Sequence, residues 1–308
     1  MNVKAFRERK RIMHTINENT TTISGQHFTG ERALFKGRDL KISGCLFDDG
    51  ESPLKESNNI DVTNTVFGWR YPLWYAKHVR VTSSTFLDGV RAGLWYSRDV
   101  EIKDTVYAGP KGIRKCKGVR LENVQFPNGE ETLWWNEDVE LENVTITGDY
   151  LLQGSTNIHI KNLNLTGKYS FDGCSNVVVE DSRLITKDAF WNSENVVVRN
   201  CFIVSEYLAW NAKNITFENC IIQSLQGLCY VDGLTMRKCT MIDCDLAFEY
   251  CTDIDAEIVS SIVSIKNPIS GTITAPEIGE IIFDDEDVDR SKTTIITAKE
   301  CPCLRVVA

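Results

Sequence analysis

One apolar residue recurs along this chain every 19 to 21 positions, and that period constrains the fold more than any other feature. A second apolar column follows two residues after the first, with mostly polar residues between them. Alternation with period two places both columns on one side of a strand. The first column reads Leu40, Ile60, Val79, Val100, Val119, Val139, Ile158, Val177, Val196, Ile215, Leu234 and Ile254. A repeat of this length is too short for most helical repeats and fits one turn of a β-solenoid.

The repeat therefore predicts an all-β chain folded as a single-stranded parallel β-helix of about 12–13 coils. We expect one domain over residues 1–308, with the coils in residues 26–275. The pattern is lost at both ends, which predicts an N-terminal cap in residues 1–25 and a C-terminal cap in residues 276–308. Such caps would cover the unpaired backbone groups at the two open ends of a solenoid.

Polar residues also recur in columns. Coils in parallel register lie about 4.8 Å apart, so residues of one column become neighbours along the rod. The polar column between the apolar ones begins Lys41, Asp61, Arg80, Glu101, Arg120, Glu140, which predicts ladders of alternating charge. Four residues past the first apolar column stand Asn64, Asp104, Asn123, Asn143, Asn162, Asp181, Asn200 and Asn219. Asn and Asp tolerate left-handed backbone angles, and stacked amides can bond to one another.

Composition narrows the classes of partner and compartment. The net charge of -9 disfavours nucleic acid and anionic membranes as partners. No run of apolar residues approaches the length of a membrane span, and the basic segment Met1 to Thr20 lacks the apolar stretch of a secretory signal. Most of the 11 cysteines stand in columns otherwise filled by Val, Leu, Ser or Thr, which indicates buried thiols in a reducing compartment. We therefore expect a cytoplasmic protein with no metal site and no cofactor.

The sequence feature that most strongly suggests a function lies five residues before the first apolar column. Tryptophans recur there with charged residues between them, and tyrosines follow in the adjacent column. The position before this row is apolar throughout, so the row itself should face outward. Exposed aromatic rings interrupted by polar groups suit a carbohydrate, with sugar C–H faces packed on the rings. The ligand-binding residues predicted on this basis are Trp74, Tyr75, Trp95, Tyr96, Arg114, Trp134, Trp191 and Trp210.

Other interpretations of this aromatic face stay open. The terminal caps would hide it if they folded back, and it would serve equally as a self-association surface in a homo-oligomer. A basic cluster crosses the same face: Arg70, Arg91, Lys111, Arg114, Lys115 and Lys117. These side chains either receive a carboxylate or phosphate on a sugar, or pair with Glu130, Glu131 and Glu137 of the next coil.

Acid–base catalysis needs two groups converging on one bond, and no such pair stands out. The weak catalytic candidates are Asp172, Glu131 and Asp188, with Asp172 in the tryptophan row itself. Whether the protein is an enzyme stays open. The sequence supports a protein that binds a carbohydrate or sugar phosphate, and the alternative is a non-catalytic scaffold.

The repeated pattern Asn-Val-x-Val-x-Asn, as at Asn195 to Asn200, carries a resemblance. Residues from about 30 to 275 resemble the pectin-lyase-like superfamily of right-handed parallel β-helices, and within it a bacterial family without an assigned function. The asparagine column resembles the internal asparagine ladder of the pectate-lyase type. The resemblance implies polysaccharide chemistry, so an enzyme would be a hydrolase, lyase or isomerase. The Gly-His-Gly of the polygalacturonase-like members is absent, and Arg114-Lys115-Cys116-Lys117 does not reproduce their Arg-x-Lys, so no family catalytic residue carries over.

Overall fold

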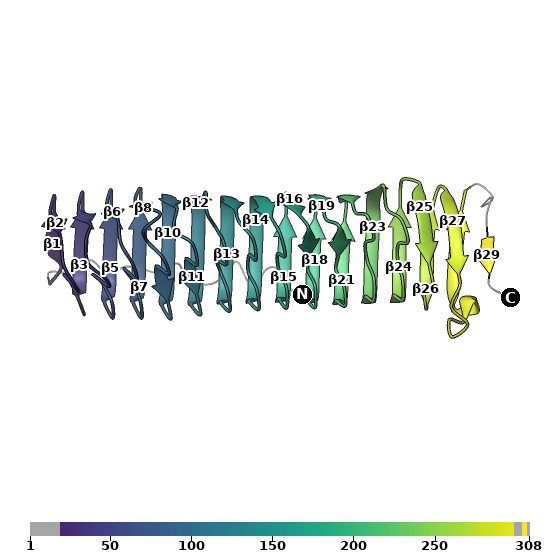
Figure 1. Cartoon of the computed structure of the whole chain (residues 1–308), viewed down its shortest axis with the longest axis horizontal. Coiled ribbons are helices and arrows are strands. Elements are labelled where there is room, and N and C mark those ends of the chain that lie inside the picture. The colour runs from purple at the N-terminus through teal and green to yellow at the C-terminus, as the bar shows by residue number, and fades with distance from the viewer. Residues whose placement is uncertain (1–18, 299–303, 307–308) are drawn as a thin grey trace.

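The computed structural model describes residues 19–298 and 304–306, which form an elongated rod of stacked coils (Figure 1). Every strand pair in this part of the chain is parallel, and each strand pairs with one a coil away. The register continues along one column from Thr21 to Thr293 and gives about 15 turns. The predicted parallel β-helix is confirmed.

The long face of the rod is made by the strands that carry the two inner apolar columns. These are β1 (Thr21–Ser24), β3 (Arg38–Ser43), β5 (Asn58–Thr63), β7 (Lys77–Thr82), β10 (Arg98–Tyr107), β12 (Lys117–Phe126), β13 (Glu137–Thr147), β14 (Thr156–Gly167), β15 (Ser175–Glu180), β18 (Glu194–Arg199), β21 (Lys213–Glu218), β23 (Asp232–Ile242), β24 (Thr252–Ile258), β26 (Gly271–Ala275) and β28 (Thr293–Thr297). In β10, β12, β13, β14 and β23 the strand continues around the next corner.

Where the long strand stops at the corner, a short second strand follows it. These are β2 (His27–Phe28), β4 (Leu46–Phe47), β6 (Val66–Phe67), β8 (Thr85–Phe86), β16 (Arg183–Thr186), β19 (Phe202–Val204) and β22 (Ile221–Gln223). Isolated two-stranded pairs mark a further face: β9 (Leu94–Trp95) with β11 (Ile113–Arg114), and β17 (Asp188–Ala189) with β20 (Tyr207–Leu208). A separate sheet near the C-terminus contains β25 (Ile262–Lys266), β27 (Ile278–Phe283) and β29 (Leu304–Val306).

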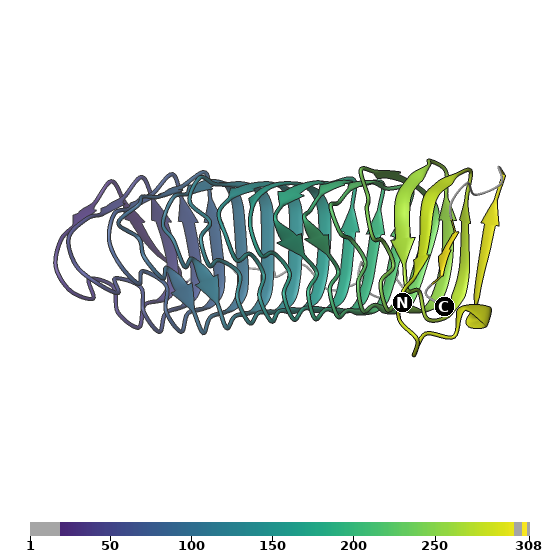
Figure 2. The ribbon, with the colours of Figure 1, turned by 45° about the vertical axis from the view of Figure 1, so that its right-hand side comes forward.

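The solenoid contains more coils than the 12–13 predicted. Strand β1 adds a turn before Leu40 and strand β28 adds one after Gly271, so regular coils extend beyond residues 26–275 at both ends (Figure 2). The short 3-10 helix η1 (Arg290–Lys292) precedes β28. The remaining parts of the two predicted caps, residues 1–18, 299–303 and 307–308, lie outside the described residues. Among the described residues, no helical segment combines the length and the hydrophobicity that a transmembrane helix requires.

The interior of the N-terminal coils contains a continuous stack of aromatic rings. Successive ring centroids lie 4.6 to 5.3 Å apart, close to the spacing between coils. The stack comprises Phe28, Phe47, Phe67, Phe86, Tyr107 and Phe126. Further along, the same column is aliphatic, with Ile146, Leu165, Leu184 and Ile203 fully buried. All nine cysteines of the described chain are buried free thiols, and Cys301 and Cys303 lie outside it.

The predicted ladders are present on the outer surface. Opposite charges pair between coils, as in Lys103 with Glu122 at 2.7 Å and Arg120 with Glu140 at 3.4 Å. The asparagine column forms an amide ladder: Asn162 donates to Asn143 at 2.7 Å. This ladder is exposed, so its resemblance to the internal ladder of the pectate-lyase type is wrong in one respect. The left-handed corner turns the amides outward, where they bond along the rod beside solvent.

Candidate ligand-binding groove

Four side chains of the tryptophan row are hydrogen-bonded to the main chain of the rod. Each of four indole N–H groups donates to a main-chain carbonyl on the next coil. The pairs are Trp74 to Ala92 at 2.5 Å, Trp95 to Lys111 at 2.8 Å, Trp191 to Tyr207 at 3.0 Å, and Trp134 to Tyr150. Trp210, the fifth member, packs against Trp191 at 5.9 Å. All five rings are half-buried, so the row faces outward without standing free in solvent.

Within this row, Arg114 is sandwiched between two tryptophans. Its guanidinium carbon lies 5.2 Å from the ring centre of Trp95 and 4.0 Å from that of Trp134. Trp95 in turn stacks on Trp74 at 5.3 Å. A planar guanidinium sandwiched between indole faces gains cation–π attraction that grows as water is excluded. The side chain of Arg114 is accordingly almost fully buried, with 6% of the residue exposed.

The charge of Arg114 is neutralised by Glu131 on the next coil. The guanidinium donates to the Glu131 carboxylate at 2.5 Å and to the Glu131 carbonyl at 2.8 Å, and Lys111 binds the same carboxylate at 2.8 Å. Burial lowers the pKa of Arg114, although Glu131 opposes that shift. Burial alone would raise the pKa of Glu131, but the hydrogen bonds from Lys111 and Arg114 outweigh it and lower the pKa. Arg114 and Lys111 of the basic cluster therefore pair with Glu131 of the next coil, which is one of the two alternatives that the sequence left open. Lys117 likewise pairs with Glu137 at 2.6 Å.

The adjacent row is more exposed to solvent than the tryptophan row. Tyr75, Tyr96 and Trp135 are 44%, 37% and 48% exposed. The two tyrosine rings stack at 4.9 Å, and the ammonium of Lys115 lies 5.4 Å from the ring of Tyr96 and 5.3 Å from that of Trp135. At the other end, the ammonium of Lys55 lies 5.8 Å from the ring of Tyr75. We call these five residues the aromatic ladder.

The backbone of the aromatic ladder is unusual for such residues. Tyr75, Tyr96 and Trp135 have φ of 56°, 61° and 53°, in the left-handed region that bulky residues rarely adopt. Further along the rod the same row contains Gly154, Gly173, Asn192 and Asn211, which tolerate these angles. The glycine at 154 has a second reason, because a Cβ there would lie 2.6 Å from the Trp135 ring. Tyr230 and Tyr250, further along the same row, have φ of 57° and 53°, so the left-handed corner is a property of the coil and is not confined to the groove.

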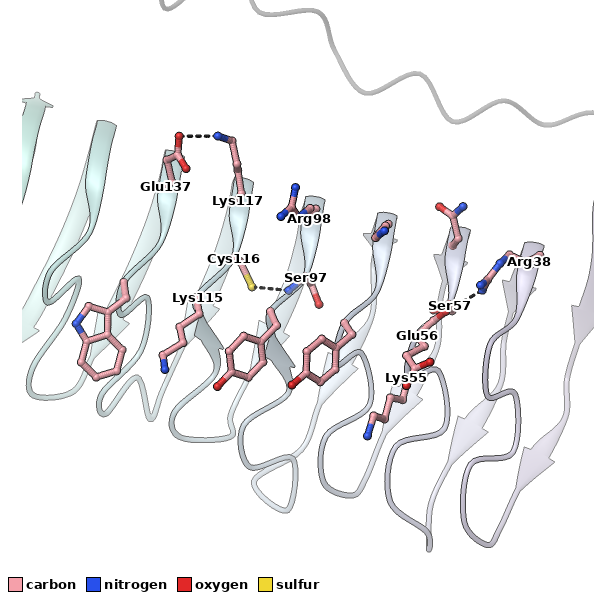
Figure 3. Close-up of a pocket in the computed structure, with 15 residues that line it drawn as sticks. Arg38, Lys55, Glu56, Ser57, Ser97, Arg98, Lys115, Cys116, Lys117 and Glu137 are labelled. Atoms are coloured by element: carbon pink, nitrogen blue, oxygen red, sulfur yellow. Dashed lines mark hydrogen bonds and ion pairs between the residues drawn. The ribbon is translucent and has the colours of Figure 1, made fainter.

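The aromatic ladder borders an open groove of about 1150 Å³. The groove crosses several coils, and its wall on the side of the long strands carries Lys117, Arg98 and Arg38 (Figure 3). Six basic and two acidic side chains line it: Arg38, Lys55, Lys77, Arg98, Lys115 and Lys117, with Glu56 and Glu137. Of the predicted ligand-binding residues the groove includes Tyr75 and Tyr96, whereas the tryptophan row does not line it.

The three weak catalytic candidates have separate surroundings. Asp172 accepts hydrogen bonds from Asn192 at 2.9 Å and Gln153 at 3.4 Å. Asp188 is 3% exposed, and burial raises its pKa despite the nearby Lys187. One of its carboxylate oxygens has no hydrogen-bond partner. Among the described residues, no hydrogen bond or ion pair joins Asp172, Asp188 and Glu131 to one another, and no group of three or more His, Cys, Asp or Glu could hold a metal ion.

Part of the groove is made by residues outside the predicted ligand-binding set. These are Lys77, Arg98 and Trp135. The signal for the two basic residues was present, because Lys77, Arg98 and Lys117 stand two residues before three successive members of the first apolar column. Three basic residues in one column interrupt the alternation of charge seen elsewhere.

Strand pairing and groove together define a parallel β-helix protein with a charged surface groove. The chain belongs to the family described as "Protein of unknown function (DUF3737)", whose model matches residues 21–296. The search of curated proteins found no match to this chain.

Among solved structures, the chain is similar to the A-module of mannuronan C-5 epimerase AlgE4 from Azotobacter vinelandii, with 9% identity and a TM-score of 0.34, covering 88% of this chain and 91% of that one. It is also similar to PfbA, a surface adhesin of Streptococcus pneumoniae, with 10% identity and a TM-score of 0.27, covering 83% of this chain and 72% of that one.

Proposed function

We propose that this protein binds an extended saccharide in the groove beside the aromatic ladder. The observation that carries the proposal is the exposure of Tyr75, Tyr96 and Trp135 in a row along the rod, where all three line the groove. The coil spacing of about 4.8 Å repeats the same polar and aromatic groups along the axis. A linear polymer with a regular repeat can use such an array, with its hydroxyls bonded to the phenols and charged groups.

The proposal is for binding and leaves catalysis out. The three carboxylates nominated for acid–base chemistry are held by other partners or buried, and they do not converge. Arg114, Trp74, Trp95 and Trp134 stabilise the rod beneath the groove through their stack and their main-chain bonds. In this proposal the saccharide contacts the aromatic ladder and the basic residues of the groove wall.

Calorimetric titration with a panel of neutral and acidic oligosaccharides tests the proposal. Tyr96→Ala and Trp135→Ala should weaken binding of the recognised saccharide by about tenfold or more each, since each removes an exposed aromatic contact. Tyr230→Ala is the matched control, because Tyr230 occupies the same row in a distant coil and is 43% exposed. If no saccharide binds the parent protein, the proposal fails.

Self-association through the same face is the competing function. It would explain exposed aromatic side chains equally well, because such patches mark protein interfaces. Sedimentation velocity separates the two. A saccharide-binding protein keeps its sedimentation coefficient when Tyr96 is replaced by Ala, whereas an assembly held by this face dissociates.

A further inference from the structure

A column of like charges runs along the wall of the groove. Lys77, Arg98 and Lys117 pair in direct parallel register on three successive coils. Like charges directly opposite one another on adjacent strands destabilise a sheet. The next residue in the column, Glu137, carries the opposite charge and pairs with Lys117 at 2.6 Å.

Two further basic groups of the groove lie beside aromatic rings and have no carboxylate partner. Lys55 and Lys115 belong to the aromatic ladder, where their ammonium groups lie over aromatic rings. Among the described residues, no carboxylate lies within 4 Å of the charged groups of Lys55, Lys77, Arg98 or Lys115. Four uncompensated positive charges therefore gather on one surface of a protein whose net charge is -9.

The same register position is treated differently elsewhere on the rod. Lys213 occupies the column of Lys77 and Arg98, but its neighbours on the adjacent coils are Glu194 and Asp232. The alternation there lets each charge attract both of its neighbours. The fold therefore does not require a basic column, and the exception coincides with the groove.

We propose that the groove selects an anionic saccharide, one that carries a carboxylate or a sulfate ester on its successive sugars. The inference rests on the proposed saccharide binding and names the class of ligand. A chain laid along the rod would bring negative charges near successive coils, where they would meet Lys77 or Arg98 from the wall and Lys55 or Lys115 from the aromatic ladder. Charge-assisted hydrogen bonds to these groups are about twice as strong as neutral ones.

The test compares ligands that share a sugar backbone and differ in charge. The full chain is titrated calorimetrically with a galacturonate hexamer and with its methyl ester, which has the same sugars and no charge. Dextran sulfate and dextran oligosaccharides form a second pair, so the tighter anionic member assigns carboxylate or sulfate. We expect the anionic member to bind about tenfold or more tightly, and its affinity to fall when salt rises from about 20 to about 200 mM.

Matched variants locate the effect. Lys77→Gln with Arg98→Gln should weaken binding of the anionic member by about tenfold or more, because two charge-assisted contacts are lost. Lys213→Gln, at the same register position, should change it less than about twofold. Unchanged melting temperatures of these variants would show that they fold, since all three side chains are exposed.

The remaining outcomes separate the two proposals. If the neutral and anionic members bind equally, with no salt dependence and no effect of the double variant, the charge inference is wrong and saccharide binding stands. If neither pair binds at all, both proposals fail. If single-stranded polyuridylate binds more tightly than either anionic saccharide, the groove serves a nucleic acid and the inference is overturned.

Discussion

Two stretches of the rod use the same repeat positions for different purposes. In the coils around residues 75–135 the left-handed corner carries tyrosine, lysine and tryptophan, whereas around residues 192–211 it carries asparagine. Asn211 donates to Asn192 at 2.9 Å, and Asn192 donates to Asp172 at 2.9 Å, so the amides stabilise the corner along the axis. The asparagine stretch shows what the fold alone favours at this position. The aromatic stretch departs from it at the groove, and Tyr230 and Tyr250 depart from it again further along the rod.

The largest expected effect concerns the interiors of the two stretches. Phe86→Ala should lower the free energy of unfolding by about 3–5 kcal/mol, because Phe86 is fully buried and leaves a cavity. It also stacks with Phe67 at 4.8 Å and Tyr107 at 4.6 Å, which adds about 0.5–1.5 kcal/mol per pair. Leu184 stands in the same interior column further along the rod, where the column is aliphatic. Leu184→Ala should therefore lower the free energy of unfolding by less. Urea denaturation of both variants measures the difference, and an equal or larger loss for Leu184→Ala contradicts a special role of the stack.

The next effect concerns the buried cation of the tryptophan row. Arg114→Met should cost about 1–3 kcal/mol, because Glu131 loses one of its two cationic partners and stays partly buried. The double variant Arg114→Met with Glu131→Gln should recover part of that loss, since the partly buried carboxylate is removed and only the more exposed Lys111 is left without its partner. Thermal denaturation of the single and double variants decides the point. No recovery in the double variant would mean that Arg114 acts mainly through packing against Trp95 and Trp134.

Exchanging corner residues between the stretches tests the comparison directly. Asn211→Tyr should cost on the order of 1–2 kcal/mol, because it breaks the amide ladder and places a bulky residue at a left-handed angle. Tyr96→Asn should stay within about 1 kcal/mol of the parent, since a lost ring stack is offset by a better corner residue. A large loss in Tyr96→Asn would make the aromatic ladder structural. Melting temperatures of the two variants, measured side by side, give the answer.

Two carboxyls give opposite pH dependences in the two stretches. The pKa of Glu131 is lowered in the folded state, so it stabilises the fold above its unfolded pKa and loses that contribution as the pH falls through the folded pKa. The pKa of Asp188 is raised by burial, so its ionisation destabilises the fold, and that penalty is relieved as the pH falls through the raised pKa.

Variants separate these two contributions. At pH 7, Glu131→Gln should lower the melting temperature and Asp188→Asn should raise it, and both differences should shrink toward acidic pH. Melting curves from neutral pH down to about pH 3 check both signs, since this window spans the ordinary carboxyl pKa values. A melting temperature of Asp188→Asn below the parent at neutral pH would show that the carboxylate is paired.

The smallest effect concerns the surface columns. Arg98→Glu places a negative charge between Lys77 and Lys117 and should raise the melting temperature by on the order of 1 °C. Lys213→Glu places a like charge between Glu194 and Asp232 and should lower it by a similar amount. Scanning calorimetry at low salt resolves such shifts. If both substitutions shifted the melting temperature in the same direction, the like charges of the groove column would not be shown to repel one another.

The repeat was enough to predict the columns of stacked residues. Strict periodicity fixes which residues share a register position, so the coils, the charge ladders and the buried apolar columns such as Ile42 and Val62 could be predicted. Periodicity does not reveal how deeply each side chain is buried. Depth depends on how the corners turn and on what the next coil places beside a residue, as when Glu131 neutralises Arg114. The number of coils was also underestimated, because Thr21 and Thr293 replace the aliphatic residues of the repeat.

The packing between coils sets which aromatic row is the more exposed to solvent. Trp95 and Tyr96 are adjacent in sequence, yet the indole N–H of Trp95 binds a carbonyl 16 residues away while Tyr96 borders the groove. It also brought the basic column of Lys77 and Arg98 to the same surface as the aromatic ladder. Period and alternation fix neighbours along the rod. Exposure and charge balance are set by contacts across coils and corners, which a linear pattern does not contain.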